Sequence, residues 1–407
     1  MKWRMFICAI CFLIGGCSLN IPLEDQFSDP DAITDVLSAR SLLASAYKAM
    51  PQQIFQLSVL SDDFCPSQHL NKDMSLQGLY NWREVEMTEL AGTLWAGYYA
   101  VIAEVNALLA RIDAVVTLDE TEKLEKMRIV CEAKALKSWC YFDLLRLFAP
   151  RYEGNENKDG IILKKRVELD FLPRSSVKEC VTEIRTLLNE ARNVDNTQKN
   201  VYWLSDKAVA YLQVELELYA GNYPAVLELT KDLETEYPES VLGADVYKYL
   251  WSSENSDARI FGKYQLEQIY MDIRFDTFEK GDYLVLSQNV DYEEEDIRKE
   301  WSEIPFVMPD AKNVRLLGKY NKMNRDKVAS KYVNVARAAG MWLMRVEALA
   351  RSGKEGDAVA LANRMLKQRG ATEWSTNIAG NELISKILIE RQKEYVVKAN
   401  FFCLIID

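Results

Sequence analysis

Four consecutive residues, Tyr80-Asn81-Trp82-Arg83, combine the side-chain types that hold a sugar. The apolar faces of sugar rings stack on Trp and Tyr, while sugar hydroxyls exchange hydrogen bonds with amide and guanidinium groups. The surrounding segment, residues 51–90, is polar and aromatic and shows no helical periodicity, so we expect an irregular surface there. The competing interpretation is that these loop aromatics pack as satellites of the core.

Three further aromatic residues, Tyr283, Tyr292 and Trp301, are the second set of candidates for ligand contact. They lie in a stretch that breaks the helical pattern, where loops tend to carry function. The acidic run from Glu293 to Asp296 in the same stretch could attract calcium. It lacks the alternating spacing and the glycine of a calcium loop, which favours a solvated face.

The sequence offers little for catalysis. His69 is the only histidine, so a zinc site built on several histidines is impossible, and no Gly-x-Ser-x-Gly motif supports a Ser-His-Asp triad. No phosphate-binding glycine loop and no dinucleotide fingerprint is present. Paired carboxylates for glycoside hydrolysis stay open, because their separation cannot be read from sequence. We predict a protein that is not an enzyme and has no cofactor and no metal.

The N-terminus predicts export. Lys2 and Arg4 precede the apolar run 5–14, which is far shorter than the roughly 20 residues that span a bilayer. The following Ile14-Gly15-Gly16-Cys17 resembles the lipobox of bacterial lipoproteins. This predicts a signal peptide over residues 1–16, lipidation of Cys17 and a tether over residues 17–28, the alternative being an ordinary signal peptide with a chance cysteine. Several acyl chains on one thiol would give stable anchoring.

The net charge limits which partners are possible. The formal net charge of −11 becomes −13 when Lys2 and Arg4 are removed with the signal peptide, and no basic stripe offsets it, so nucleic acid is not expected as a partner.

Five cysteines remain besides Cys17 and the two in the signal peptide, and their spacing fits neither a disulfide framework nor a zinc site. We expect free thiols at these positions: Cys65, Cys131, Cys140, Cys180 and Cys403.

The elements that position these residues are predicted to be mainly helical. Periodic apolar residues indicate helices from Asp29 to Pro51, around Trp95 to Ile112, and from Glu120 to Phe148. A further helix is predicted to begin after Pro173-Arg174-Ser175-Ser176 and to end at Ala191. Two later helical hairpins turn at Gly221 and Gly353 and resemble tetratricopeptide-type helix pairs. Between them, residues 241–330 form an irregular insert, with the best strand patterns in 259–270 and 282–286.

In this order, the blocks resemble the SusD/RagB family of outer-membrane nutrient-binding lipoproteins of Bacteroidetes-type bacteria. The blocks that carry the resemblance are the Cys17 lipobox, Asp31-Ala32-Ile33, Trp95 to Asn106, Glu132 to Phe148, Pro173 to Val177, Arg345 to Ala348 with Asn363-Arg364, and Glu390 to Glu394. The family's terminal helix continues differently from Val397 onward, so the chain looks truncated at its C-terminal end, which puts the packing of the last hairpin in doubt.

The resemblance implies one domain over residues 29–407, with a helical scaffold (29–240 and 331–407) of tetratricopeptide-like units in a superhelix and a partly β insert (241–330). It also implies a lipid-anchored protein, exposed on the cell surface at the outer membrane, that captures a glycan or a peptide for a partner SusC-like TonB-dependent transporter. In the family, the stretch before the Trp-Tyr-Ile-Asn helix often contributes to the ligand surface. Two alternatives are a tetratricopeptide-like scaffold that binds proteins only and an anchored hydrolase.

Overall fold

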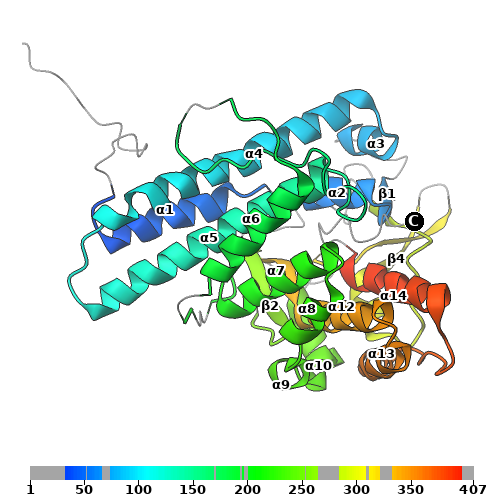
Figure 1. The fold of residues 1–407 in the computed structure, drawn as a ribbon. Helices are drawn as coiled ribbons and strands as arrows, with labels where there is room; N and C mark the ends of the chain where they lie inside the picture. The colour runs from blue at the N-terminus through cyan, green and yellow to red at the C-terminus, as the bar shows by residue number, and fades with distance from the viewer. Residues whose placement is uncertain are drawn as a thin grey trace, which may run out of the picture.

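The computed structural model describes residues 33–51, 53–66, 74–168, 171–192, 195–196, 200–252, 254–264, 284–308, 311–320 and 332–396. The predicted signal peptide, the predicted lipidation site Cys17, the predicted tether and the residues from 397 onward lie outside these residues. The predicted fold class is confirmed: the protein is mainly α, with helical hairpins and a few short strands (Figure 1).

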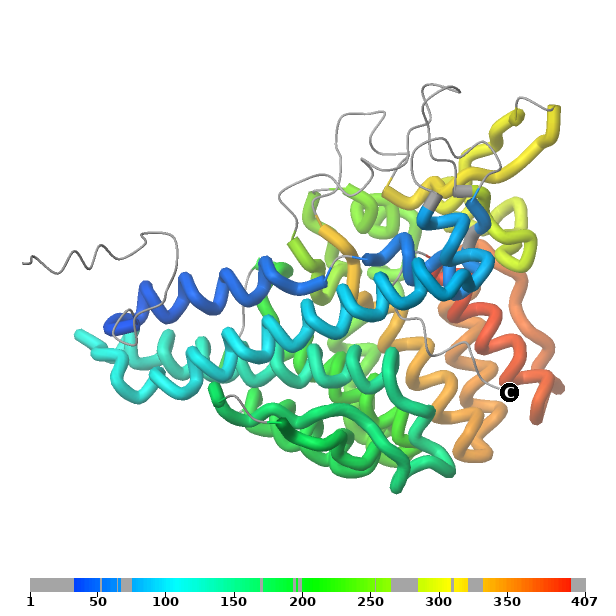
Figure 2. Tube along the Cα trace, turned by 90° about the horizontal axis from the view of Figure 1, so that it is seen from above, coloured from blue at the N-terminus to red at the C-terminus, as the bar shows by residue number. Residues whose placement is uncertain are grey.

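Long helices form one half of the molecule. These helices are α1 (Val36–Ala49), α4 (Glu84–Arg111), α5 (Glu120–Phe148) and α6 (Val177–Glu190). They pack side by side in the order of the chain, with their axes roughly parallel in Figure 2. The turn η2 (Ile112–Ala114) follows α4. Residues 84–114 are long and apolar enough to cross a membrane by length and composition alone. Here α4 packs on α1, α3 and α5, as the core helix of a folded domain does.

Helix boundaries follow local capping. The predicted helix from Glu120 to Phe148 is confirmed at both ends. At its start, the Asp119 side chain accepts a hydrogen bond from the backbone N–H of Glu122. The first helix was predicted to open at Asp29, and this start is wrong. Asp35 caps it instead: its side chain accepts a hydrogen bond from the Ser38 backbone N–H, and the Asp35 backbone N–H donates to the Ser38 hydroxyl. Helix α1 therefore begins at Val36.

The segment 51–90 is less irregular than predicted. It contains the short helices α2 (Ile54–Leu60) and α3 (Met74–Tyr80), the strand β1 (Phe64–Pro66) and the start of α4. Helices of seven residues are too short for an apolar period to show in the sequence. These two are stabilised by packing against each other, and α3 also packs on α4.

The other half contains the predicted hairpins. The first is α7 (Asp206–Tyr219) with α8 (Tyr223–Leu229), and the second is α12 (Ala338–Arg351) with α13 (Glu355–Arg369). Gly221 and Gly353 adopt φ values of +68° and +74°, which L-residues with a side chain rarely adopt, so glycine ends each first helix as predicted. Helix α14 (Gly380–Tyr395) packs on α12. Short turns connect α8 to the insert: α9 (Leu233–Glu236), η3 (Glu239–Leu242), α10 (Ala244–Tyr247) and η4 (Lys248–Trp251).

Strands within the insert pair with strands that lie outside residues 241–330. Antiparallel β2 (Arg259–Tyr264) and β6 (Tyr332–Arg337) form one pair, and the second sheet has the order β1-β3-β5-β4. Its other strands are β3 (Leu284–Leu286), β4 (Glu303–Val307) and β5 (Asn313–Leu317), with helix α11 (Ile297–Ser302) before β4. Because β1 pairs with β3, the segment that carries Tyr80 to Arg83 and the insert lie at the same end of the molecule (Figures 1 and 2).

Buried charges connect α14 to the rest of the molecule. The carboxylate of Glu394 lies 2.9 Å from a guanidinium nitrogen of Arg337, 3.2 Å from one of Arg369 and 3.6 Å from one of Arg298. These four side chains are buried and come from α14, β6, α13 and α11. Lys319 donates to the carbonyl of Glu394 at 3.0 Å, which satisfies one free acceptor at the end of α14.

Candidate functional site

The predicted residues 80–83 form the connection between two helices. Tyr80 ends α3, Asn81 and Trp82 form a turn, and Arg83 is the N-cap of α4. Backbone hydrogen bonds fix the turn: Trp82 N–H donates to the Leu79 carbonyl at 3.0 Å, and Arg83 N–H donates to the Gly78 carbonyl at 2.9 Å. The Asn81 side chain also points back, donating to the Gln77 carbonyl at 2.8 Å. Asn81 is therefore engaged within the turn.

Trp82 is the exposed aromatic residue of this turn. Its side chain is 61% exposed, next to Tyr80 at 40% and Val85 at 74%. Its φ is +54°, in the left-handed region that a bulky residue seldom adopts. Strained residues of this kind cluster at ligand sites, and here strain is combined with exposure of a large apolar ring.

A second loop meets the turn at the same surface. Asp62, between α2 and β1, also has a left-handed backbone, with φ +58°. A hydrogen bond to Cys65 is the main cause that raises the pKa of Tyr80, and the charge of Asp62 adds to it, so these three side chains lie close together. Arg83 forms an ion pair with Glu86 one turn into α4. We name this region, comprising Asp62, Tyr80, Asn81, Trp82 and Arg83, the Trp82 surface.

The candidates in the insert have different positions. Tyr292 is only 3% exposed and its hydroxyl donates to the Lys393 carbonyl at 2.8 Å, so it is a core residue. This burial corrects the prediction that Tyr292 contacts a ligand. Trp301 lies on α11, half-buried and packed against the core. Tyr283 lies outside the described residues; β3 begins at the next residue, and its Leu284 pairs with Pro66 of β1.

Sequence reasoning missed an aromatic cluster where β2 ends and β6 begins. Tyr202 lies 5.9 Å from Tyr264 and 6.5 Å from Tyr332 between ring centroids, and Trp203 lies 5.3 Å from Tyr202. Tyr202 and Trp203 are adjacent in a loop, but Tyr264 and Tyr332 are distant in sequence, so no periodicity links the cluster. The rings turn toward one another, which leaves less free ring face here than at Trp82.

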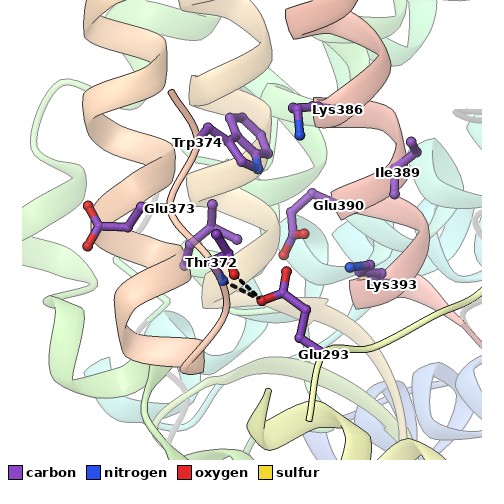
Figure 3. Close-up of a pocket in the computed structure, with 9 residues that line it drawn as sticks. Glu293, Thr372, Glu373, Trp374, Lys386, Ile389, Glu390 and Lys393 are labelled. Atoms are coloured by element: carbon purple, nitrogen blue, oxygen red, sulfur yellow. Dashed lines mark hydrogen bonds between the residues drawn. The ribbon is translucent and has the colours of Figure 1, made fainter. Parts of the chain in front are cut away.

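A cavity of about 300 Å³ lies between the α13–α14 connection and α14 (Figure 3). This volume is at the lower end of the range of about 300 to 1,000 Å³ that is usual for small-molecule sites. Its lining combines one indole, apolar side chains and charged groups of both signs, from Glu293, Leu366, Thr372, Glu373, Trp374, Lys386, Ile389, Glu390 and Lys393. None of these residues was predicted as a site residue.

A second cavity, of about 330 Å³, lies among α6, α7 and α8. Its polar side chains bond to one another: Arg185 pairs with Glu217 at 2.5 Å, Asn222 donates to Glu217 at 2.7 Å, and Gln213 donates to Asn189 at 2.9 Å. These groups already have partners, and an aromatic side chain is missing from the lining, so this cavity offers less to a ligand.

The acidic run from Glu293 to Asp296 is divided among different partners. Glu293 accepts from Thr372, Glu294 pairs with Lys299, and buried Asp296 pairs with Arg298 at 2.6 Å. Across the described part of the chain, no group of three or more His, Cys, Asp or Glu side chains is arranged to hold a metal ion. The described cysteines are free thiols: Cys65 half-buried, and Cys131, Cys140 and Cys180 buried.

Residues 23–214 match a family of SusD-like proteins described as starch-binding and associating with the outer membrane. The structure is similar to a SusD-like carbohydrate binding protein from Bacteroides vulgatus, with 18% identity over 91% of this chain and 83% of that chain and a TM-score of 0.72. A putative sugar binding protein from the same species has 20% identity over 92% and 87%, with a TM-score of 0.75. The surface glycan-binding protein A from Bacteroides uniformis has 16% identity over 90% and 87%, with a TM-score of 0.66.

A comparison with curated proteins found no match. The family match covers the segment from the tether to α7, and the structural similarity extends over the hairpins and the insert of the second half. The segment with the family match contains the Trp82 surface, whereas the cavity beside α14 lies in the half that only the structural comparison covers. Residues 23–214 thus match the SusD-like family in sequence, and the chain shares its fold with SusD-like structures.

Proposed function

We propose that this protein is a lipid-anchored, surface-exposed glycan-binding protein of the outer membrane that captures an oligo- or polysaccharide for import by a partner TonB-dependent transporter. The observation that carries the proposal is Trp82, a largely exposed indole in a strained turn that a second strained loop adjoins. The family description and the names of the similar structures, which refer to starch, carbohydrate and glycan, support the choice of ligand.

The Trp82 surface suits a sugar for physical reasons. The indole offers an apolar face for ring stacking, and Asp62 and Arg83 supply an acceptor and donors for hydroxyl groups. Hydrogen bonds hold the turn before any ligand arrives, so binding loses little conformational entropy. A peptide could use the same indole, and a ligand screen separates the two classes.

Binding without hydrolysis is part of the proposal. A glycosidase needs a carboxylic acid whose pKa is raised so that it can protonate the leaving oxygen. In the cavity of Figure 3, the carboxylates of Glu293 and Glu390 point toward each other. The hydrogen bonds from Thr372 lower the pKa of Glu293, which is the wrong direction for a general acid.

The test is a glycan array followed by titration calorimetry with the best oligosaccharide. Trp82→Ala should weaken binding at least tenfold, or about 1.4 kcal/mol, because the stacking face is lost. Val85→Ala is the matched control, since it shortens an exposed apolar side chain on the first turn of α4 and should leave affinity unchanged. Equal affinity of wild type and Trp82→Ala would remove the Trp82 surface from the proposal, and binding of protein partners alone would favour a scaffold.

The anchor and the partner belong to the same proposal. The start of α1, which the tether joins, and the α3–α4 turn lie at opposite ends of the long helices (Figures 1 and 2). An anchor at Cys17 would thus leave the Trp82 surface at the far end of the helices. Loss of palmitate labelling in Cys17→Ser, and co-purification of the wild type with a TonB-dependent transporter, check these two points.

A further inference from the structure

The cavity beside α14 is built on a connection that is fixed at three points. Asn363 of α13 accepts from Trp374 N–H at 2.7 Å and donates to the Trp374 carbonyl at 2.9 Å. Thr372 donates to Glu293 through its backbone N–H at 2.7 Å and its hydroxyl at 2.5 Å. Gly370 has φ +67°, and a side-chain carbon there would lie 2.5 Å from the Glu295 carbonyl. The connection is therefore preorganised.

The indole of Trp374 forms one wall of this cavity. The ring is half-buried and packs in part against the core, while the rest lines the cavity. The lining also includes Leu366, which is buried, and Ile389, which is half exposed. A flat apolar wall of this kind fits the face of a pyranose ring.

Charged groups stand at defined places around the indole. Figure 3 shows the ammonium group of Lys386 beside Trp374, with the carboxylates of Glu293 and Glu390 and the ammonium group of Lys393 at the other end, whereas Glu373 points away. Glu390 is paired with Arg298 at 2.6 Å, and Lys393 contributes to the lowered pKa of Glu293. Lys386 makes no ion pair with any residue that the structure describes.

We infer that this cavity is a second sugar site, distinct from the Trp82 surface, for a pyranose ring that carries an anionic substituent. The ring stacks on Trp374, and its carboxylate or sulfate group pairs with the ammonium group of Lys386. Ring hydroxyls donate to the carboxylates of Glu293 and Glu390, which are held in place by Thr372 and Arg298. Its volume of about 300 Å³ limits the site to an end or a branch of a chain. The inference rests on the proposed glycan binding for the class of ligand and extends it to acidic sugars.

Titration calorimetry with three short oligosaccharides tests this site: tetragalacturonate, a chondroitin sulfate tetrasaccharide and maltotetraose. Short probes limit repulsion from the net charge of −11. At least one anionic probe should bind the wild type. Both probes carry carboxylates and only the chondroitin fragment carries sulfate, so binding of tetragalacturonate shows that a carboxylate suffices. Trp374→Ala should weaken that binding at least tenfold and Lys386→Ala at least fivefold, whereas Lys367→Ala, an exposed control on α13, should have no effect.

The outcomes separate this site from the Trp82 surface. Trp82→Ala should leave the anionic probe bound with unchanged affinity, and Trp374→Ala should leave the Trp82-dependent oligosaccharide bound. Absence of binding by both anionic probes, or equal affinity in wild type and Lys386→Ala, overturns the inference. Because Lys386 is exposed, its substitution does not threaten folding. A loss of all binding in Trp82→Ala shows a single site and also overturns it.

Discussion

The backbone of Trp82 combines strain and exposure in one residue. A left-handed conformation costs an ordinary L-residue about 1–2 kcal/mol, and glycine avoids this cost. The native turn keeps the conformation because backbone bonds to Leu79 and Gly78 and the bond from Asn81 to Gln77 fix it. In this account, the strain is tolerated because it holds the indole outward.

This view predicts an order of stability among variants at one position. Trp82→Gly should be more stable than Trp82→Ala by about 1 kcal/mol, because only glycine relieves the positive φ. Both variants should have lost glycan affinity alike. Urea unfolding of the two proteins measures the difference, and equal midpoints would show that the turn is not strained at Trp82.

Trp82 and Tyr292 were both predicted to contact a ligand, and only Trp82 is exposed. Both are aromatic residues in stretches without helical periodicity, and local sequence treats them alike. What separates them is long-range packing: Tyr292 is covered by α14 and bonds to the Lys393 carbonyl. Trp374 was missed for the same reason, since its cavity needs Asn363, Thr372 and Glu293 brought together from different parts of the chain.

At the scale of elements, the docking of α14 depends on Glu394. Its carboxylate pairs with Arg337 and Arg369, so its removal leaves these two buried cations without their main counter-charge. Arg298, 3.6 Å away, keeps its shorter ion pairs with Asp296 and Glu390. Glu394→Gln should destabilise the protein by about 3–5 kcal/mol, the cost of breaking a buried ion pair from one side. Glu382→Gln, at the exposed start of α14, should be nearly neutral in the same denaturation experiment.

The pH dependence of this effect has a defined sign. Burial raises the pKa of Glu394, but the charges of Arg369, Arg337 and Arg298 lower it by more than burial raises it. The net result is a pKa of about 2 instead of the ordinary 4.5. The stabilisation is therefore complete above about pH 4.5 and is lost as the pH falls toward 2. The stability difference between wild type and Glu394→Gln should shrink over this range, and a constant difference would contradict the role of the charge.

Elements with a strong period or a local cap could be predicted from sequence, and the others could not. The boundaries of α5 and the glycine-ended hairpins were confirmed, because capping and φ preference are local. The start of α1 was misplaced because two aspartates, Asp29 and Asp35, are both plausible caps. Strand pairing of β1 with β3 joins residues more than two hundred positions apart, which no local pattern encodes.

At the scale of the whole molecule, the long helices separate two ends of the protein, and the strands connect the Trp82 surface to the insert. The long helices separate the start of α1 from the Trp82 surface, and the β1-β3-β5-β4 sheet connects that surface to the insert. Glu394 in turn ties the insert to the last hairpin through Arg298. The insert is thus packed into the rest of the fold, and this packing holds the loops at this end of the molecule in place.

Hydrogen–deuterium exchange with the oligosaccharide that binds best on the glycan array tests the central claim most directly. Peptides covering residues 61–66 and 78–86 should exchange more slowly with the sugar than without it, while the centre of α5 should not change, and the mass of the sugar should stay constant throughout. Slowing confined to other segments, or cleavage of the sugar during the incubation, would contradict a binding protein that acts through the Trp82 surface.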